Sequence, residues 1–304
     1  MVERVLVILA HFFKPEAMGR YSSTLEHMRA ARRQALERVL TSWRGLYGPQ
    51  RELNIAQKKF VCFGGVIRKL DIVILINNSS HLLDDELITR YRLKIQNIET
   101  DNPRLLPFGA HGLIKKWVTE YDWFVYSEDD LVPHDPALFG KQALFGERFG
   151  SRRVLQPNRF ELNQTQTYIK TYVDGPLRQA LIEELWRHVR EESPSLLLNT
   201  ELGPVAFVRA VNPHSGFFMI SGEQAKYWVQ QPHFMDMDCS FISPLESAAS
   251  LSLLKTFSLY KAAAPQFSFF EIEHMDQKFS SMRLPQSSAP NDQGVAKQDG
   301  KGLL

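Results

Sequence analysis

The chain has 304 residues, of which 44% are hydrophobic and 23% are charged, values usual for a globular protein. This length accommodates one large α/β domain or two small ones, and the composition excludes disorder, collagen and coiled coil as descriptions of the whole chain. Because 36 basic residues nearly balance 34 acidic ones, for a net charge of +2, we expect no binding to nucleic acid or to an anionic membrane.

The N-terminal half predicts alternating strands and helices. Strands are expected at four short apolar runs and helices at two amphipathic segments: Val5–Ala10, Leu70–Ile76, Lys94–Ile98 and Trp123–Tyr126 as strands, Ser22–Trp43 and Phe108–Thr119 as helices. This order predicts an α/β fold with a Rossmann-type, mostly parallel central sheet flanked by helices. Ligands of such sheets bind beyond the carboxyl ends of the strands, where His11, Asn77 and the acidic run from Glu128 to Asp130 follow the predicted strands.

The second half predicts a more mixed arrangement. The pattern favours, in chain order, a strand over Val154–Leu162 broken at Pro157, a helix over Leu177–Glu192, a strand over Gly216–Ser221 followed directly by a helix, a helix over Pro244–Leu254, and a strand over Gln266–Ile272 that leads into Glu273 and His274. We therefore expect a single domain over residues 1–284, with halves at about 1–135 and 136–284. The polar residues 285–304 predict a disordered tail.

The cysteines and the apolar runs predict the cellular location of the protein. Cys62 and Cys239 lie far apart, which excludes a disulfide scaffold or a multi-cysteine zinc site and fits a reducing compartment. No run approaches the roughly 18 apolar residues of a membrane span, and Val5–Ala10 is typical of a buried strand and not of a secretory signal. We therefore expect a cytoplasmic location and no transmembrane segment.

The acidic run Glu128, Asp129 and Asp130 is the sharpest chemical feature. Three adjacent carboxylates repel one another unless a cation or several hydrogen-bond donors neutralise them. Oxygen ligands of this kind suit Mg²⁺ or Mn²⁺, often together with a substrate phosphate. The alternative is a solvated acidic turn before a helix that starts near Asp135. The position directly after a buried strand favours a metal site.

The segment from Asp122 to Phe139 resembles the metal-binding DxD region of GT-A-fold glycosyltransferases, in which a short hydrophobic strand ends in the acidic motif. The glycine-containing start of the preceding helix, Pro107 to Gly112, adds to the likeness. The resemblance implies that Asp130 is the principal ligand of Mn²⁺ or Mg²⁺. It also implies that Glu128 takes the first acidic position, near the ribose or a metal-bound water, where glutamate replaces the usual aspartate.

Three later segments resemble the same family in the expected order. The run from His214 through Gly216 to Ser221 is similar to the strand beneath the acceptor, and it is equally compatible with an ordinary buried strand. Glu246, at a helix start, matches the catalytic base of inverting members, although Ser243 and Glu246 also have the spacing of a capping box. Asp236 and Asp238 are competing candidates for the base. His274 matches a late histidine that binds the metal.

The resemblance, which covers residues 4 to 276, implies a metal-dependent glycosyltransferase of glycan or polysaccharide biosynthesis. Such an enzyme moves a sugar from a nucleoside diphosphate sugar to an acceptor hydroxyl, here with inversion if Glu246 is the single base. The donor site comprises His11 and Asn77 beside Glu128, Asp129 and Asp130. The acceptor site comprises Arg159, Glu161, His214 and Gly216.

Two other classes of protein remain open. The first is another metal-dependent nucleotide enzyme, a nucleotidyltransferase or phosphohydrolase, which would use the same carboxylates. Against it, the sequence contains no GxxxxGK[ST], HExxH or GxGxxG motif. The second is a protein that binds a nucleotide or carbohydrate on the same fold without catalysis. A serine hydrolase is disfavoured because no GxSxG motif occurs.

Overall fold

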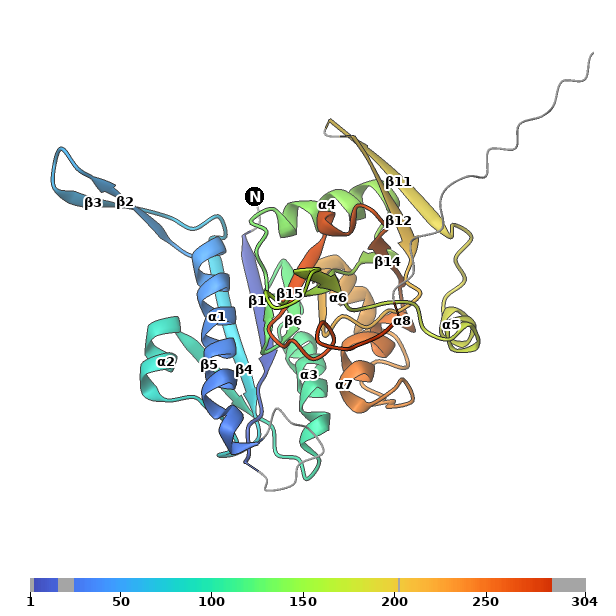
Figure 1. The fold of residues 1–304 in the computed structure, drawn as a ribbon, viewed down its shortest axis with the longest axis horizontal. Helices are drawn as coiled ribbons and strands as arrows, with labels where there is room; N and C mark the ends of the chain where they lie inside the picture. The colour runs from blue at the N-terminus through green and yellow to red at the C-terminus, as the bar shows by residue number, and fades with distance from the viewer. Residues whose placement is uncertain (1–2, 16–24, 202, 286–304) are drawn as a thin grey trace, which may run out of the picture.

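The computed structural model describes residues 3–15, 25–201 and 203–285 (Figure 1). The tail predicted for 285–304 lies outside these residues except for Pro285, and so do residues 22–24 of the first predicted helix. Within the described part of the chain, no helix combines the length and the apolar character that crossing a membrane requires.

A five-stranded sheet forms the centre of the molecule, in the order β13-β6-β1-β4-β5. Four strands run parallel, and they confirm the four strands predicted in the first half: β1 (Arg4–Ala10), β4 (Lys69–Ile76), β5 (Leu93–Asn97) and β6 (Trp123–Glu128). The fifth strand, β13 (Phe217–Ser221), pairs with β6 in the antiparallel direction. The chain is therefore mixed α/β with one parallel-rich sheet.

Alternate side chains of β1 enter two separate cores, because successive side chains of a strand point to opposite faces. Val5, Val7 and Leu9 lie in one core with residues of α1 (Arg29–Tyr47) and α4 (Leu138–Phe149). Leu6 and Ile8 lie in the other core with residues of α3 (Gly109–Lys116) and α6 (Gly222–Trp228). Helices thus cover both faces of the sheet, as the near-continuous apolar strands predict (Figure 1).

The remaining helical segments are short. They are η2 (Glu26–Met28), α2 (Asp85–Tyr91), η3 (Pro103–Phe108), α5 (Gln179–Trp186), α7 (Pro244–Glu246), η4 (Ser247–Leu251), α8 (Ser252–Leu254) and η5 (Phe267–Phe269). The helix expected over Leu177–Glu192 is shorter and spans Gln179–Trp186; beyond it, Arg209 donates to the carbonyls of Trp186 and Val189. The helix predicted from Pro244 to Leu254 is confirmed as the consecutive segments α7, η4 and α8, with a π-helical centre.

Two further sheets and a separate hairpin complete the fold. One sheet has the order β10-β9-β15-β7 and the other β11-β12-β14-β8; a two-stranded sheet consists of β2 and β3. Their strands are β2 (Gln50–Asn54), β3 (Lys59–Phe63), β7 (Leu131–Val132), β8 (Arg153–Leu155), β9 (Asn158–Leu162), β10 (Lys170–Tyr172), β11 (Ser195–Thr200), β12 (Gly203–Arg209), β14 (Ser258–Ala262) and β15 (Glu271–His274).

Two predicted strands are corrected. Pro157 does more than interrupt the strand over Val154–Leu162, since the residues on its two sides, β8 and β9, join different sheets. The strand predicted from Gln266 begins only at Glu271, after the 3₁₀ turn η5.

The sheet that contains β15 brings distant polar residues together. The two-residue strand β7 directly follows Asp130 and pairs with β15, so that Leu131 lies opposite His274. On its other side β15 runs parallel to β9, with Ile272 beside Arg159. This register carries His274 and Glu161 to the carboxyl end of β6.

Candidate active site

The polar residues predicted at the ends of β1, β4 and β6 lie at the same edge of the central sheet, because the three strands are parallel neighbours. Glu128 is the last residue of β6 and lies opposite Ala10 of β1. His11 follows directly, and its backbone N–H donates to the carbonyl of Leu75 in β4. This edge is where open α/β sheets bind ligands.

Asp129 is buried and turned toward α1. One carboxylate oxygen lies 2.5 Å from Nδ1 of His11, and the other accepts a hydrogen bond from Arg32 of α1. Burial alone would raise the pKa of Asp129, but the guanidinium of Arg32 and the His11 hydrogen bond outweigh it and hold this pKa at about 2. Asp129 is therefore a permanently ionised anchor for His11 and Arg32.

Only one of the two carboxylate oxygens of Asp130 has a hydrogen-bond partner among the described residues. Its Oδ2 accepts a hydrogen bond of 2.7 Å from Arg32, while its buried Oδ1 has no hydrogen-bond partner among the described residues. Nε2 of His274 lies 3.9 Å from Oδ2. Because a buried polar atom without a partner is costly, the free oxygen of Asp130 is the atom of this run that is available to accept a further bond.

His274 is held by a second carboxylate. Its Nδ1 lies 2.9 Å from Oε1 of Glu161, and the other oxygen of Glu161 accepts the backbone N–H of Ser280 at 2.7 Å. Burial lowers the pKa of His274, but the bond to Glu161 and the charge of Asp130 outweigh it, so the net pKa is raised. A histidine oriented by a carboxylate in this way is typical of metal ligands.

Glu128 points away from Asp129, toward the segment that precedes β13. Burial raises its pKa to about 7, and the charges of Asp130 and Glu246 act in the same direction, while Arg159 and His274 oppose them. Gly216 makes room for this carboxylate. A Cβ at Gly216 would lie 2.4 Å from Oε2 of Glu128, and the φ of Gly216 is +59°. Glycine meets both requirements without strain and without displacing Glu128.

Glu246 lies at the start of α7, close enough for its charge to act on Glu128. The capping box predicted for Ser243 and Glu246 does not form, since the Ser243 side chain accepts no bond from the helix. Instead, the Ser243 hydroxyl donates to Oε2 of Glu246. Oε1 of Glu246 has no hydrogen-bond partner in the described ranges. The half-buried carboxylate therefore lies near enough to Glu128 to act on its charge, and the Ser243 side chain does not cap the helix.

Arg159 and His214 belong to a buried network centred on Asp174. Oδ1 of Asp174 accepts 2.9 and 2.8 Å bonds from Nε and Nη2 of Arg159, and Oδ2 accepts a 2.8 Å bond from Lys261. Two cations thus share one carboxylate, and the surplus positive charge acts on Glu128. Burial and then Arg159 lower the pKa of His214 to about 3. Neutral His214 has a buried Nδ1 without a partner among the described residues.

The two residues predicted near the nucleotide are already engaged in hydrogen bonds. Nε2 of His11 accepts the backbone N–H of Leu82 at 2.9 Å, so that both ring nitrogens have partners. Asn77 donates from Nδ2 to the carbonyl of Thr100 at 2.8 Å. The competing candidates Asp236 and Asp238 both pair with Lys255.

Sequence reasoning missed three residues of the site. Arg32 lies within a helix that the sequence predicted, but only the fold shows that it bridges Asp129 and Asp130, which lie 97 and 98 positions later. No sequence pattern around Asp174 or Lys261 indicated that either residue belongs to the site. A single arginine among the several of α1 could have been selected only by knowing which face covers the sheet edge.

The described residues contain no group of three or more histidine, cysteine or acidic side chains already arranged around a cation position. The 3.9 Å between Nε2 of His274 and Oδ2 of Asp130 involves the oxygen that Arg32 already binds. The unpartnered Oδ1 of Asp130 is the oxygen of this carboxylate that remains without a hydrogen bond among the described residues.

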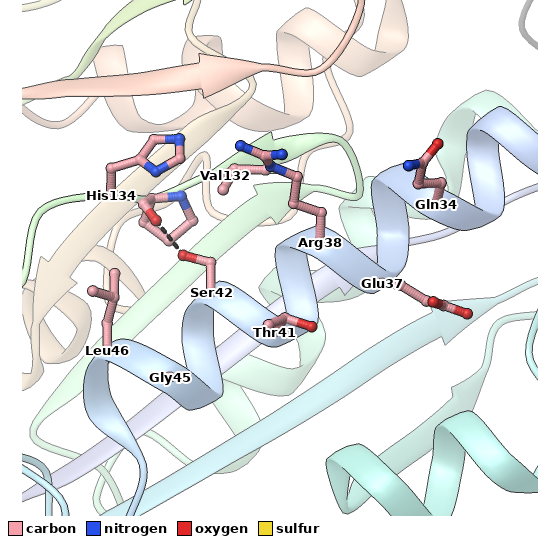
Figure 2. Close-up of a pocket in the computed structure, with 10 residues that line it drawn as sticks. Gln34, Glu37, Arg38, Thr41, Ser42, Gly45, Leu46, Val132 and His134 are labelled. Atoms are coloured by element: carbon pink, nitrogen blue, oxygen red, sulfur yellow. Dashed lines mark hydrogen bonds between the residues drawn. The ribbon is translucent and has the colours of Figure 1, made fainter. Parts of the chain in front are cut away.

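Two cavities lie near this edge. One of about 560 Å³ lies between α1 and the residues after β7, and Figure 2 shows Arg38, Thr41 and Ser42 along the helix with Val132 and His134 opposite. Glu273 contacts His134 and Arg38, so this cavity lies on the opposite face of β15 from His274. The other, of about 520 Å³, lies beyond β5 and is lined by Thr100, Phe108 and His111.

Comparison with known proteins gives no family assignment. No protein-family model matches the sequence, and no curated protein matches it. Among solved structures, the crystal structure of S. aureus TarS resembles 88% of this chain, with 11% sequence identity and a TM-score of 0.40. The matched region is 38% of the TarS chain, so this chain spans well under half of the length of that protein. A likeness this weak supports no inference about fold or activity.

Proposed function

We propose that the chain is a GT-A-like, metal-dependent glycosyltransferase that moves a sugar from a nucleoside diphosphate sugar to an acceptor hydroxyl with inversion. One observation carries the proposal. Asp130 presents a buried oxygen without a partner beside His274, whose ring is fixed by Glu161, at the ligand-binding edge of a parallel-rich sheet. The charge of Glu246 acts on Glu128, so the proposed base is near one of the proposed metal ligands.

Asp130, Glu128 and His274 are the residues that would hold Mn²⁺ or Mg²⁺. The cation, when bound, would neutralise charge on the departing diphosphate. Arg32 supports the same site from α1, since it keeps Asp129 paired and leaves one oxygen of Asp130 for the ligand. Glu161 would position the ring of His274, since one of its oxygens binds His274 and the other accepts the backbone N–H of Ser280.

Glu246 would act as the base. In the transfer, the acceptor oxygen forms a bond to the anomeric carbon, the bond from that carbon to the diphosphate oxygen breaks, and the acceptor proton passes to Glu246. The Ser243 hydroxyl occupies Oε2 and orients the carboxylate, so Oε1 is the oxygen available for the proton. The cavity beyond β5, beside Asn77 and Thr100, is a suitable place for the nucleoside of the donor.

The test is a panel of nucleotide sugars with UDP, GDP, CMP and dTDP, each with and without Mn²⁺. The true donor raises the unfolding temperature in the presence of Mn²⁺, because a ligand that binds only the folded state stabilises it. With that donor, Glu246→Gln should bind normally and lose about 10²–10⁴-fold in transfer rate. Donor hydrolysis without transfer to any hydroxyl would indicate a phosphohydrolase, and full activity of the variant would exclude Glu246 as base.

A further inference from the structure

The hairpin β2–β3 extends from the body of the molecule and shares no sheet with it (Figure 1). The five residue pairs of the hairpin join only these two strands to each other. An isolated two-stranded hairpin is at best marginally stable in water, and it needs further strands or a packed face to persist. The two strands therefore lack, within one described chain, the partner that such an element requires.

The hairpin and its flanks expose apolar side chains. Leu53, Ile55, Phe60, Phe63 and Val66 are between 49% and 79% exposed. Residues directly opposite on paired strands share a face, so Leu53 and Phe60 lie on one face with Cys62. An exposed apolar surface of this kind on a projecting element marks a protein interaction site.

The base of the hairpin is fixed to the body. A Cβ at Gly65 would lie 2.5 Å from the carbonyl oxygen of Tyr47, so the chain after β3 packs tightly on the end of α1. Tyr47 and Ile67, on either side of the hairpin, are both buried. The hairpin is thus held in one direction from its base and presents its edges to solvent.

The two edges differ in charge, and this difference identifies the partner. In two-fold pairing of antiparallel strands, one residue at the centre lies opposite its own copy. On β2 the central residue would be Glu52, and like charges directly opposite one another are destabilising. On β3 the central residue is Val61, with Phe60 opposite Cys62 of the second copy. Natural edge strands that avoid pairing carry charges, as β2 does and the centre of β3 does not.

We propose that the chain forms a two-fold dimer through the β3 edges, which joins the two hairpins into one four-stranded antiparallel sheet. The partner is a second copy of this chain, and the symmetry axis passes beside Val61. The new sheet places Phe60 of each copy beside Cys62 of the other and gives the hairpin the additional strands that it lacks. The dimer is independent of the proposed transferase activity, because the hairpin contributes no residue to the acidic cluster described above.

Cys62 provides a direct probe of this geometry. Its thiol is free and exposed, and in the Val61-centred register it lies diagonal to Cys62 of the second copy. Such diagonal neighbours lie about 7–8 Å apart, a distance that a short bismaleimide spans. In a Cys239→Ser background, which leaves Cys62 as the single thiol, the reagent should give a covalent dimer, and the further change Cys62→Ser should abolish it.

Light scattering on the full chain supplies the second measurement. We expect a mass near twice 35.0 kDa for the wild type and near 35.0 kDa for Val61→Lys, which places two lysines opposite each other. Gln50→Lys adds the same charge on β2 and should remain a dimer, and equal unfolding temperatures of the two variants show that both are folded. A monomeric wild type without Cys62 crosslinking overturns the proposal, and so does a dimer that persists in Val61→Lys.

Discussion

At the scale of single residues, the three consecutive carboxylates have different surroundings because only Glu128 lies in β6, while Asp129 and Asp130 lie in the turn that follows it. Asp129 points toward α1 and is neutralised by Arg32 and His11. Glu128 points the other way, toward Gly216, and burial brings its pKa to about 7. Asp130 lies between them with one oxygen unpartnered. The local repulsion expected from the sequence is thus relieved by separating the three groups.

Arg32 should be required for stability only when no cation is bound. Arg32→Gln leaves Asp129 and Asp130 without their shared partner, and removing one member of a buried ion pair costs about 3–5 kcal/mol. We expect a loss of this size in urea unfolding with EDTA, a smaller loss in Arg32→Lys, and substantial recovery of Arg32→Gln by Mn²⁺. Wild-type stability of Arg32→Gln in EDTA would show that the pairing contributes nothing.

The network around Asp174 should make stability depend on pH. Burial would raise the pKa of Asp174, but Lys261 and Arg159 lower it to about 2 in the folded chain, below its ordinary value of 3.8. The stabilisation is therefore present above about pH 4 and is lost as the pH falls toward 2. The difference in unfolding free energy between wild type and Asp174→Asn should narrow by about 1 kcal/mol between about pH 5 and about pH 3. A constant difference would contradict the pairing.

The chemistry of the site was predictable where it was local in sequence. Glu128, Asp129 and Asp130 follow an apolar run, and the sequence correctly predicted that they end a buried strand. Arg32, Asp174 and Lys261 were not predictable, because their significance arises only from contacts with residues far away in the chain. The roles of His11, Asn77, Arg159, Glu161, His214 and His274 toward ligands remain predictions.

At the scale of elements, the turn that precedes β13 determines where Glu128 can lie. Gly216→Ala adds a Cβ that collides with the Glu128 carboxylate and places alanine at a positive φ. We expect a loss of about 1–2 kcal/mol from the backbone conformation and roughly tenfold weaker Mn²⁺ binding in calorimetric titration.

Gly146→Ala is the matched control for this change. Gly146 lies inside α4, and nothing lies within 4 Å of the position that a Cβ would take there, so alanine should be neutral or stabilising by up to about 1 kcal/mol. Unchanged Mn²⁺ binding in Gly216→Ala would show that Glu128 is not a ligand.

Elements with a strong apolar pattern were predicted well, and exposed ones were not. The central strands have two buried faces and therefore read as continuous apolar runs. Strands β2 and β3 are exposed almost throughout; β2 contains no apolar run, and the short run from Phe60 to Phe63 in β3 was not predicted as a strand. Strand β14 is fully buried but short, and it follows the helix α8 so closely that the pattern did not separate the two.

At the scale of the whole molecule, the near balance of 36 basic and 34 acidic residues agrees with the ion pairs that neutralise charges inside the structure. Charges at the sheet edge are paired internally, Arg32 with Asp129 and Asp130, and Arg159 with Asp174. In the proposed function, affinity for an anionic nucleotide would then come from a local cation and not from a basic surface. The pairing of these groups depends on three sheets meeting at one edge, which no local pattern encodes.

Calorimetric titration of Mn²⁺ into the chain in the presence of the donor nucleotide tests the central claim most directly. We predict binding of one ion by the wild type, and its loss in Asp130→Asn, which should still unfold cooperatively in EDTA. Asp122→Asn is the control, since Asp122 precedes the other end of β6 and pairs with Arg4. Equal Mn²⁺ binding by the wild type and Asp130→Asn, or no binding by either, would contradict the metal site at Asp130.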